Sequence, residues 1–385
     1  MHLGVSALGP VSRLTGTRNY LTYMLPALDA ALAGDDGLTV FVSDGQQGGL
    51  PSLSARCEIV PIAGGDASPL AKVLDMEFRL PSAARRAGVQ IMYYPDNFVS
   101  LTWRGPKVVS IRNVVAYHYP WAVSVPRLMY RRALSGVSAR SAALVIVPSK
   151  SIAEDIHRLM GVPSGKVRVV PHGVAVEVFQ REIREDEVEA RLARMGVPRP
   201  YLLFVSALWA YKGADVLIQS LARLRATGTF EGYLALVGED VGQEGYARFL
   251  RAEAAREGVS EHVLFLGYRS HEELAYLYRG AELFVFPSKY ESFGNPLLEA
   301  MASGVPIVAS DMFSIPEVAG DAALLVDARH PDTLGAGIMK VLRDEQLRAK
   351  LVSNGANRVA CFSWDSAARA TLSVLREALA RSARS

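Results

Sequence analysis

The chain has 385 residues, of which half are apolar and about a fifth are charged, and its formal net charge is +3. That length suggests two or three domains, and the composition excludes a disordered or fibrous protein. The net charge is too small to indicate a nucleic-acid partner.

The first half of the chain alternates short apolar runs with amphipathic stretches. The apolar runs predict strands at Leu3–Leu8, Leu38–Ser43, Cys57–Ile62, Gln90–Tyr94, Lys107–Ile111, Leu144–Pro148 and Val167–Pro171. Helical spacing predicts helices at Thr17–Leu32, Pro69–Ala87, Trp121–Leu134 and Ser149–Met160. Strands that alternate with helices in this way favour a parallel sheet covered on both faces.

A charged segment separates the two halves. Glu177–Arg194 is dense in charge and is followed by Gly196, Pro198 and Pro200. This composition predicts a linker with a solvated helix. We therefore expect a first domain over residues 1–176, a linker over 177–198 and a second domain over 199–363.

The second half repeats the alternation. Strands are predicted at Tyr201–Ser206, Tyr233–Val237, Val263–Leu266, Leu283–Pro287, Pro306–Ala309 and Ala323–Val326. Helices are predicted at Ala214–Arg225, Gly245–Glu257, His271–Tyr278, Pro296–Ser303, Pro331–Leu342 and Trp364–Ala380. We expect the last segment, residues 364–385, to pack back on the first domain. The fold class is α/β, with two parallel-sheet domains facing across a ligand-binding cleft.

The most informative segment, Phe284–Asp311, has the pattern strand, loop, helix, strand. Asn295 suits the N-cap of the helix and Pro296 its first position, so Gly294 would bring a ligand close to the helix N-terminus. Glu291 and Glu299 frame this loop. A carboxylate beside a phosphate site is favourable where it accepts hydrogen bonds from hydroxyls, such as those of a sugar or ribose. The alternative is that Glu291 is a solvated loop residue and that Glu299 is an ordinary helix-surface residue stabilised by the helix dipole.

The stretch from Glu291 to Glu299, ESFGNPLLE, resembles the Glu-x7-Glu motif of the retaining GT-B glycosyltransferases of the fourth sequence family, the group 1 glycosyl transferases. Ile315–Asp327, Val147–Ile156 and Val167–Val174 also resemble that family. The resemblance implies two Rossmann-like domains and retaining, metal-independent transfer of a sugar from a nucleotide-diphosphate sugar. It implies no cofactor and no bound metal.

In the second domain, the resemblance assigns donor-sugar hydroxyls to Glu291 and the ribose to Glu299. Backbone amides would hold the diphosphate and sugar, at Phe293, Gly294, Asn295 and Leu297. In the stretch from Ser206 to Gly213 the family's lysine is present as Lys212, but Ala207 stands in place of its arginine. Lys212 would neutralise the leaving diphosphate. Tyr268 and Arg269 lie in the loop that resembles the family's base-binding loop, although Arg269 could equally be a surface residue.

In the first domain, the loop Gly9–Thr17 corresponds to the family's glycine loop, so Gly16 and Thr17 are candidates for donor contact. The family often has a histidine after the strand Lys107–Ile111, where this chain has Arg112 and Asn113. We expect these two residues to contact phosphate or a hydroxyl. His118 could substitute for the missing histidine, or it could be a satisfied structural histidine.

Basic residues are concentrated in the first half. Residues 1–180 carry 18 Lys and Arg against 12 Asp and Glu, and Arg79–Arg86 and Arg127–Arg140 are the main clusters. Apolar residues interleave with the second cluster, which suits a lipid-linked acceptor at a membrane face or an ordinary solvated helix.

The two cysteines and the lack of a signal-peptide pattern indicate a cytoplasmic protein, at most peripheral at the inner membrane face.

The expected reaction is sugar transfer to a carbohydrate, lipid-linked or small-molecule acceptor, in cell-surface polysaccharide or glycolipid biosynthesis. The chain lacks Gly-x-Gly-x-x-Gly, a Walker A loop, His-Glu-x-x-His and Asp-x-Asp. Two alternatives stay open. One is a nucleotide-sugar 2-epimerase on the same architecture, and the other is a non-catalytic nucleotide-sugar-binding relative, which Ala207 and Arg112 suggest.

Overall fold

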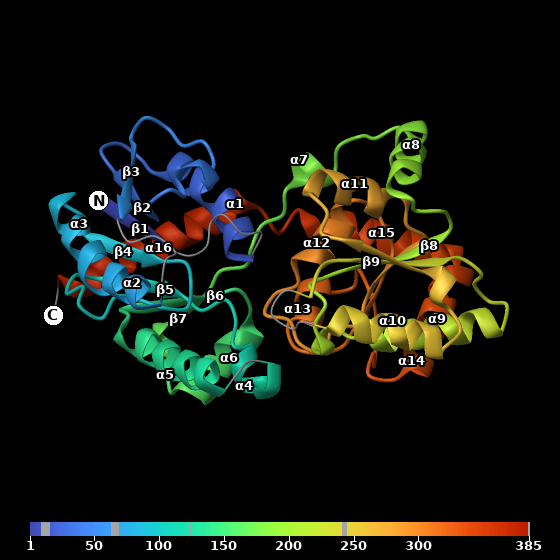
Figure 1. Cartoon of the computed structure of the whole chain (residues 1–385). Helices are drawn as coiled ribbons and strands as arrows, with labels where there is room; N and C mark the ends of the chain where they lie inside the picture. The colour runs from blue at the N-terminus through green and yellow to red at the C-terminus, as the bar shows by residue number, and fades with distance from the viewer. Residues whose placement is uncertain (9–15, 63–68, 123–124, 241–244, 384–385) are drawn as a thin grey trace. The chain divides into compact units, whose positions relative to one another are not determined.

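The computed structural model describes residues 1–8, 16–62, 69–122, 125–240 and 245–383. The chain divides into two compact units (Figure 1). Unit 1 comprises Met1–Gly173 and Ser363–Ser385, and unit 2 comprises Val174–Phe362. Each unit has its own parallel sheet, which confirms the predicted α/β class with two Rossmann-like domains.

Unit 1 contains a seven-stranded sheet in the order β3-β2-β1-β4-β5-β6-β7, and all its neighbouring strands are parallel. The strands are β1 His2–Ala7, β2 Gly37–Ser43, β3 Cys57–Ile62, β4 Ile91–Tyr94, β5 Lys107–Ser110, β6 Leu144–Val147 and β7 Val167–Val169. In β1, Val5 pairs with Val40 of β2 and with Tyr93 of β4. All three side chains are fully buried, as expected of a parallel sheet covered on both faces.

The helices of unit 1 are α1 Gly16–Ala31, α2 Pro69–Leu74, α3 Leu80–Arg86, α4 Val115–His118, α5 Val125–Ser141, α6 Lys150–Met160 and α16 Trp364–Ser382. Two predicted helices differ in detail from the structure. The helix predicted over Pro69–Ala87 is present as far as Arg86, with a π-helical turn at Asp75–Arg79 within it. Of the helix predicted over Trp121–Leu134, Trp121 lies in the 3-10 turn Pro120–Ala122, and α5 continues beyond the predicted end, to Ser141. Pro126 lies in its first turn, where the missing N–H leaves no helical hydrogen bond unmade.

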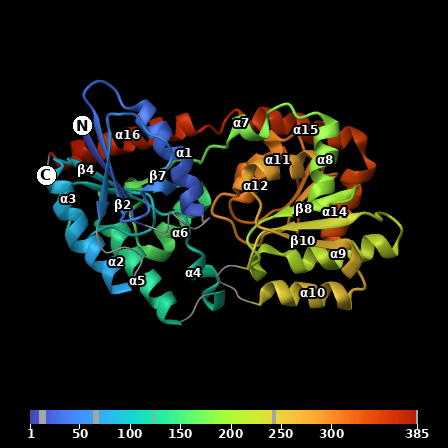
Figure 2. The same cartoon turned by 45° about the horizontal axis from the view of Figure 1, so that its top comes forward.

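The C-terminal helix α16 packs against α1 within unit 1 (Figures 1 and 2). Leu375 and Ala368 of α16 are fully buried in the same cluster as Leu25 and Leu28 of α1. At the start of α16 the indole of Trp364 stacks on Tyr23, with 5.7 Å between ring centroids. Residues more than 300 positions apart in the sequence therefore share one hydrophobic core.

Unit 2 contains a six-stranded parallel sheet in the order β10-β9-β8-β11-β12-β13. Its strands are β8 Tyr201–Val205, β9 Tyr233–Val237, β10 Val263–Gly267, β11 Leu283–Phe286, β12 Ile307–Ser310 and β13 Leu324–Val326. Its helices are α7 Val176–Phe179, α8 Glu185–Met195, α9 Ala214–Ala226, α10 Tyr246–Arg256, α11 His271–Gly280, α12 Asn295–Ala302, α13 Ile315–Ala319, α14 Pro331–Arg343 and α15 Glu345–Val359.

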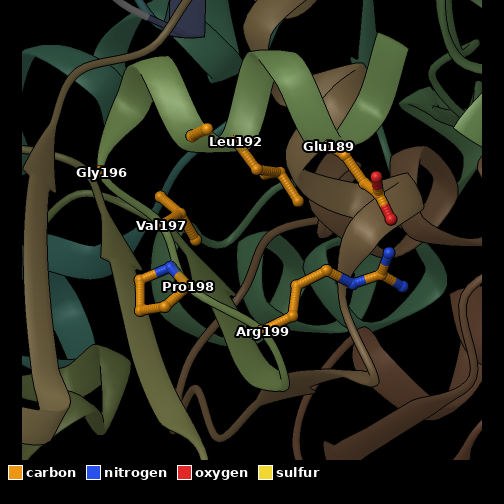
Figure 3. A pocket seen from close by; sticks show the side chains of 7 residues that line it. Glu189, Leu192, Gly196, Val197, Pro198 and Arg199 are labelled. Carbon is orange, nitrogen blue, oxygen red and sulfur yellow. The ribbon is translucent and has the colours of Figure 1, made fainter. Parts of the chain in front are cut away.

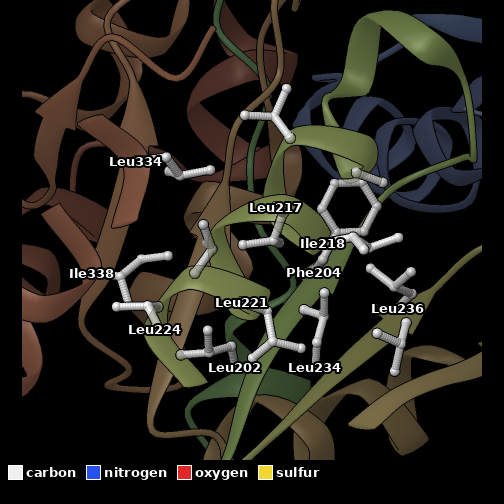
Figure 4. Packing of buried hydrophobic residues seen from close by; sticks show 14 of the residues in the cluster. Leu202, Phe204, Leu217, Ile218, Leu221, Leu224, Leu234, Leu236, Leu334 and Ile338 are labelled. Carbon is white, nitrogen blue, oxygen red and sulfur yellow. The ribbon is translucent and has the colours of Figure 1, made fainter. Parts of the chain in front are cut away.

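The main core of unit 2 lies between the sheet and the helices α9 and α14 (Figure 4). Phe204 and Leu234 from the strands meet Leu217, Leu221 and Ile338 from the helices, and all five are fully buried. Burial of each such side chain stabilises the fold by about 1.5–3 kcal/mol before entropy losses. This core fixes the strand ends from which the loops of the site extend.

The charged segment expected to form a linker lies within unit 2. Its helix α8 buries Val188 and Leu192 and packs on α11. Gly280 of α11 permits this contact, because a Cβ there would lie 2.6 Å from a Leu192 methyl group. The acidic first turn and charged outer face of α8 are exposed, which explains why its sequence resembles a solvated linker.

Candidate active site

The centre of the unit 2 sheet brings two predicted site residues together. The strand order reverses between β8 and β11, and ligands of open parallel sheets bind at the carboxyl ends of strands at such a switch point. Lys212 follows β8, at the end of the 3-10 turn Ala210–Lys212, and Glu291 follows β11. Lys212 Nζ donates to Glu291 Oε1 at 2.7 Å. Their side chains are only 12% and 11% exposed.

The environment of Lys212 keeps it protonated. Burial disfavours the charged ammonium, but the carboxylate of Glu291 and the ring of Tyr211 outweigh it and raise the pKa of Lys212. The Tyr211 ring centroid lies 5.1 Å from Nζ. A protonated, partly buried lysine is a suitable counter-charge for a departing phosphate.

Two glycines allow the backbone to approach closely around this pair. At Gly213 φ is +75°, and a Cβ there would lie 2.4 Å from the carbonyl oxygen of Pro287. At Gly294 φ is +98°. Gly294 is the N-cap of α12 and Asn295 its first residue, so the predicted N-cap at Asn295 was wrong by one position. The Leu297 N–H, expected to face a ligand, donates to Gly294 O at 3.0 Å.

Buried serine hydroxyls hold the loop between β11 and α12. Ser314 donates to the carbonyls of Glu291 and Phe293, at 2.9 and 3.2 Å. Ser310 donates to Ser288 O at 2.6 Å, and Ser288 donates to Tyr290 O at 2.9 Å. The three serines are fully buried. These serines were not predicted from the sequence, because a serine after a strand does not indicate which carbonyl its hydroxyl will bond.

Glu299 lies on α12, one turn beyond the loop. The hydroxyl of Tyr278 on α11 donates to Glu299 Oε2 at 3.0 Å. Burial raises the pKa of Glu299, while His271 and the Tyr278 hydrogen bond oppose the increase. This carboxyl is therefore held in a poorly solvated place with a phenol as partner, which argues against a solvated helix-surface residue.

The other predicted residues of unit 2 follow β8 and β10, which lie on either side of β9. Ser206 follows β8, and its amide donates to Val237 O at 3.0 Å. Tyr268 and Arg269 follow β10; Tyr268 is 41% exposed, and Arg269 lies 3.6 Å from the carboxylate of Glu273. Because all six strands are parallel, these residues lie along the same edge of the sheet as Lys212 and Glu291.

In unit 1, Arg112 joins three segments at the carboxyl ends of strands. Its guanidinium donates to Gly16 O at 3.1 Å, to Thr17 Oγ1 at 2.6 Å and to Pro95 O at 2.7 Å. It also lies 4.7 Å above the ring of Tyr20. The structure thus brings together Arg112, Gly16 and Thr17, with Arg112 holding the first turn of α1. The rest of the expected glycine loop, residues 9–15, lies outside the described residues.

Asn113 and His118 have partners within unit 1. Asn113 Oδ1 accepts from the N–H of Val115, the first residue of the short helix α4, at 2.7 Å. His118 Nε2 lies 2.5 Å from Asp155 Oδ2, and Arg158 donates to the other oxygen of Asp155 at 2.7 Å. Although burial opposes ionisation of Asp155, these two neighbours lower its pKa. The histidine is therefore oriented by a carboxylate.

Two family models match the chain. The model described as Glycosyl transferases group 1 matches residues 193–358, and that described as Glycosyltransferase Family 4 matches residues 30–178. The chain belongs to the group 1 glycosyltransferases. The first of these matches includes Lys212, Glu291 and Glu299.

Curated relatives of this glycosyltransferase agree with the family. O-antigen chain mannosyltransferase B of Escherichia coli is 28% identical over 288 residues, 74% of each chain. A D-inositol 3-phosphate glycosyltransferase of Xylanimonas cellulosilytica is 36% identical over 256 residues, which are 64% of this chain and 59% of that protein. The match thus spans about three fifths of the second relative.

A solved structure shares the fold of the glycosyltransferase. Anabaena Alr3699/HepE, in complex with UDP and glucose, has a TM-score of 0.78 and 19% identity, covering 98% of this chain and all of that one. At that identity the comparison shows the fold alone. It confirms the expected GT-B architecture.

A groove on unit 2 lies away from the predicted site of the glycosyltransferase (Figure 3). It is lined by Leu192 and Ala193 of α8 and by the segment Gly196–Arg199, which leads into the amino end of β8. Lys212 and Glu291 follow the carboxyl ends of the strands. Among the described residues, no group of three or more His, Cys, Asp or Glu is placed to hold a metal ion.

Proposed function

We propose that this glycosyltransferase moves a sugar from a nucleotide-diphosphate sugar to an acceptor hydroxyl, with retention at the anomeric carbon and without a bound metal. The observation that carries the proposal is the Lys212–Glu291 pair at the switch point of the unit 2 sheet. A cation beside a carboxylate offers one group for phosphate oxygens and another for sugar hydroxyls. The group 1 family match over residues 193–358 supports the donor class.

In the proposed reaction, Glu291 accepts hydrogen bonds from hydroxyls of the donor sugar and Glu299 accepts them from the ribose. Lys212 and the amides at the start of α12 stabilise the diphosphate as it departs. The acceptor oxygen forms its bond to the anomeric carbon on the face from which the diphosphate leaves, and a departing phosphate oxygen takes the acceptor's proton. No enzyme nucleophile is required by this scheme.

The acceptor is proposed to be a carbohydrate, a lipid-linked sugar or a small molecule, in cell-surface polysaccharide or glycolipid biosynthesis. The names of the relatives support this range, because one acts on O-antigen chains and another on inositol 3-phosphate. Peripheral contact of the chain with a membrane is part of the proposal.

The test begins with a thermal-shift panel of UDP, GDP and ADP and their sugars, with magnesium and with EDTA. A ligand that binds the native state raises its apparent stability, by about 2.7 kcal/mol at a concentration 100 times Kd. We expect one nucleotide to give a selective shift that EDTA leaves unchanged. Retention is then tested by NMR of the anomeric proton of the product.

Two variants test the pair itself. We expect Lys212→Ala and Glu291→Gln each to lower turnover by about 100-fold or more, because each removes charge stabilisation or donor positioning. Arg329→Ala, which removes an exposed ion pair with Asp327, is the control and should keep full turnover. Unchanged turnover in both site variants would refute the proposed site. Selective nucleotide binding without transfer would favour the non-catalytic relative that Ala207 suggests, and epimerised donor without acceptor would favour the epimerase.

A further inference from the structure

Three arginines of unit 2 gather around one tyrosine. Tyr276 lies on α11, and the guanidinium carbons of Arg181 and Arg191 lie 5.1 and 5.3 Å from the centroid of its ring. Arg279, three residues further along α11, donates from Nη2 to the carbonyl oxygen of Arg181 at 3.0 Å. We call the three arginines the arginine cluster.

The arginine cluster is assembled from three segments of the chain. Arg181 lies between α7 and α8, Arg191 lies on α8, and Arg279 lies on α11. Both α7 and α8 pack on α11 (Figures 1 and 2). Arg181 and Arg279 are half-buried, whereas Arg191 is exposed. The cluster is therefore fixed by the packing of the helices and is open to solvent on the side of Arg191.

The positive charge of the arginine cluster is not neutralised by carboxylates. Among the described residues, none is close enough to any of the three guanidiniums to form an ion pair. At the start of α8, Asp186 pairs instead with Arg184, and Glu185 pairs with Arg199. Like charges repel, and the face of one aromatic ring offsets that repulsion only in part. The cluster therefore has an excess of positive charge that an anion would neutralise.

The hydrogen bonding of the arginine cluster is also incomplete. The Nε atoms of Arg181 and Arg279 are buried and have no hydrogen-bond partner in the described part of the chain. A guanidinium has several N–H donors, yet the bond from Arg279 to the Arg181 carbonyl is the one side-chain hydrogen bond that the cluster donates to the described residues. Buried donors without an acceptor are rare in native proteins, and an ion is one explanation for them.

The arginine cluster lies toward the edge of the sheet opposite the Lys212–Glu291 pair. Helix α11 connects the carboxyl end of β10 to the amino end of β11. The hydroxyl of Tyr201, the first residue of β8, donates to the carbonyl of Leu277, the residue after Tyr276, at 2.6 Å. Because the Lys212–Glu291 pair follows the carboxyl ends of β8 and β11, a ligand on the cluster would not occupy the proposed donor site.

We propose that the arginine cluster binds the diphosphate group of a small ligand, at a second anion site separate from the donor site. The planar guanidinium fork matches phosphate oxygens in pairs, and several cations together suit a ligand with several negative charges better than a monoanion. This inference concerns α7, α8 and α11, and it does not depend on the reaction proposed for Lys212 and Glu291.

The first test locates the site by chemical protection of the full chain. Phenylglyoxal modifies accessible arginines, and mass spectrometry identifies the modified positions. At about 0.15 M salt, which screens general attraction between exposed charges, inorganic pyrophosphate is the probe. We expect it to slow modification of Arg191 by about tenfold at a concentration ten times Kd, since protection follows occupancy. Arg184, which is 76% exposed and pairs with Asp186, should be modified at an unchanged rate.

The second test is calorimetric titration with pyrophosphate. In Lys212→Ala, which weakens the donor site, pyrophosphate should still bind. Adding Arg181→Gln and Arg191→Gln to that chain should lower its affinity by about tenfold or more, the scale of a lost hydrogen bond from a charged group. The matched control adds Arg184→Gln and Arg199→Gln, which remove the same charge from carboxylate-paired positions of the same segment, and it should keep its affinity.

Circular dichroism would check folding of every variant. Arg191→Gln alone, at an exposed position, keeps the test decisive if the double variant does not fold. ADP or UDP that protects Arg191 at lower concentration than pyrophosphate would identify a nucleotide as the ligand, and equal protection would identify the diphosphate alone.

The inference is overturned if pyrophosphate does not protect Arg191, or if the matched control loses affinity equally. It is also overturned if Lys212→Ala alone abolishes pyrophosphate binding, which would assign that binding to the donor site. Failure of the proposed reaction is a separate result, because full turnover in Lys212→Ala would refute the reaction site and leave the protection of Arg191 unchanged.

Discussion

Two carboxylates that frame the loop before α12 have different partners. Glu291 has the ammonium of Lys212 at 2.7 Å, whereas Glu299 has the phenol of Tyr278 at 3.0 Å. A phenol offsets the cost of removing a carboxylate from water less than a cation does. The raised pKa of Glu299, caused first by burial, is the result. Such a carboxylate reduces the stability of the folded protein at neutral pH, which fits the ribose-binding role proposed for Glu299.

We expect Glu299→Gln to stabilise the protein at pH 7, because burial raises the pKa of this carboxyl and disfavours its charged form. Because its pKa is raised in the folded state, the stabilising effect of protonation is complete below the unfolded value near 4.5 and is lost as pH rises through the folded pKa. At pH 7 the carboxylate therefore disfavours folding, and glutamine removes that effect. Chemical denaturation at pH 7 and pH 4 should show a gain that shrinks at the lower pH.

The same variant should bind the donor nucleotide about tenfold more weakly, the scale of one good hydrogen bond to a charged group. Glu253→Gln is the matched control, because Glu253 is also buried but has Arg256 and Gln219 as partners. That control should destabilise the protein and leave nucleotide binding unchanged. If Glu299→Gln destabilises the protein at pH 7 as the control does, the charged carboxylate of Glu299 does not disfavour folding and this interpretation is wrong.

At the scale of elements, the loop between β11 and α12 depends on residues from the next strand. Ser314 follows β12 and holds the carbonyls of Glu291 and Phe293. Ser310, the last residue of β12, holds Ser288. The position of the site loop is thus set by strand pairing between β11 and β12, in which Val285 pairs with Val308.

Ser314→Ala should lower the free energy of unfolding by about 1–2 kcal/mol, because two buried carbonyls lose their donor. It should also lower donor affinity, since the backbone of Glu291 is no longer fixed. Equilibrium denaturation and nucleotide titration measure the two effects.

The control for this variant is Ser220→Ala. Ser220 on α9 is also fully buried, and its hydroxyl donates to the carbonyls of Val216 and Pro331 at 2.9 Å each. It should give a similar loss of stability with unchanged affinity. Equal affinities in both variants would show that the hydroxyl at Ser314 does not position the site.

For the molecule as a whole, each unit has its own core. The unit 1 core includes α16, which enters it from the far end of the sequence, and the unit 2 core is closed by α9 and α14. Chains with separate cores need not unfold in a single transition. A core substitution should therefore act first on the unit that contains it.

Leu375→Ala in α16 should lower the stability of unit 1 by about 2–5 kcal/mol, because Leu375 is fully buried and alanine leaves a cavity. Ile338→Ala in α14 is the counterpart in unit 2, where Ile338 is also fully buried. Hydrogen exchange followed by mass spectrometry should show lost protection in β1 and β4 for the first variant and in β8 and β9 for the second. Identical protection changes in the two variants would contradict the independence of the cores.

The sequence by itself determined the order of the strands, because parallel strands buried on both faces are continuous apolar runs. Every predicted strand is present within two residues at each end. It also indicated the family, because the motif from Glu291 to Glu299 is contiguous in the chain. The helix α15 was missed, although Asp344 caps it by accepting from Leu347 N at 2.9 Å.

Only the tertiary structure decided which residues meet. Lys212 and Glu291 are 79 positions apart and Arg112 and Thr17 are 95 apart, and their pairing depends on which strands are neighbours in a sheet. The pairing of Glu299 with Tyr278 and the exposure of Met129 also could not be predicted from the sequence. Both residues lie in amphipathic helices, and the side of a helix that faces the core is set by the elements that pack on it.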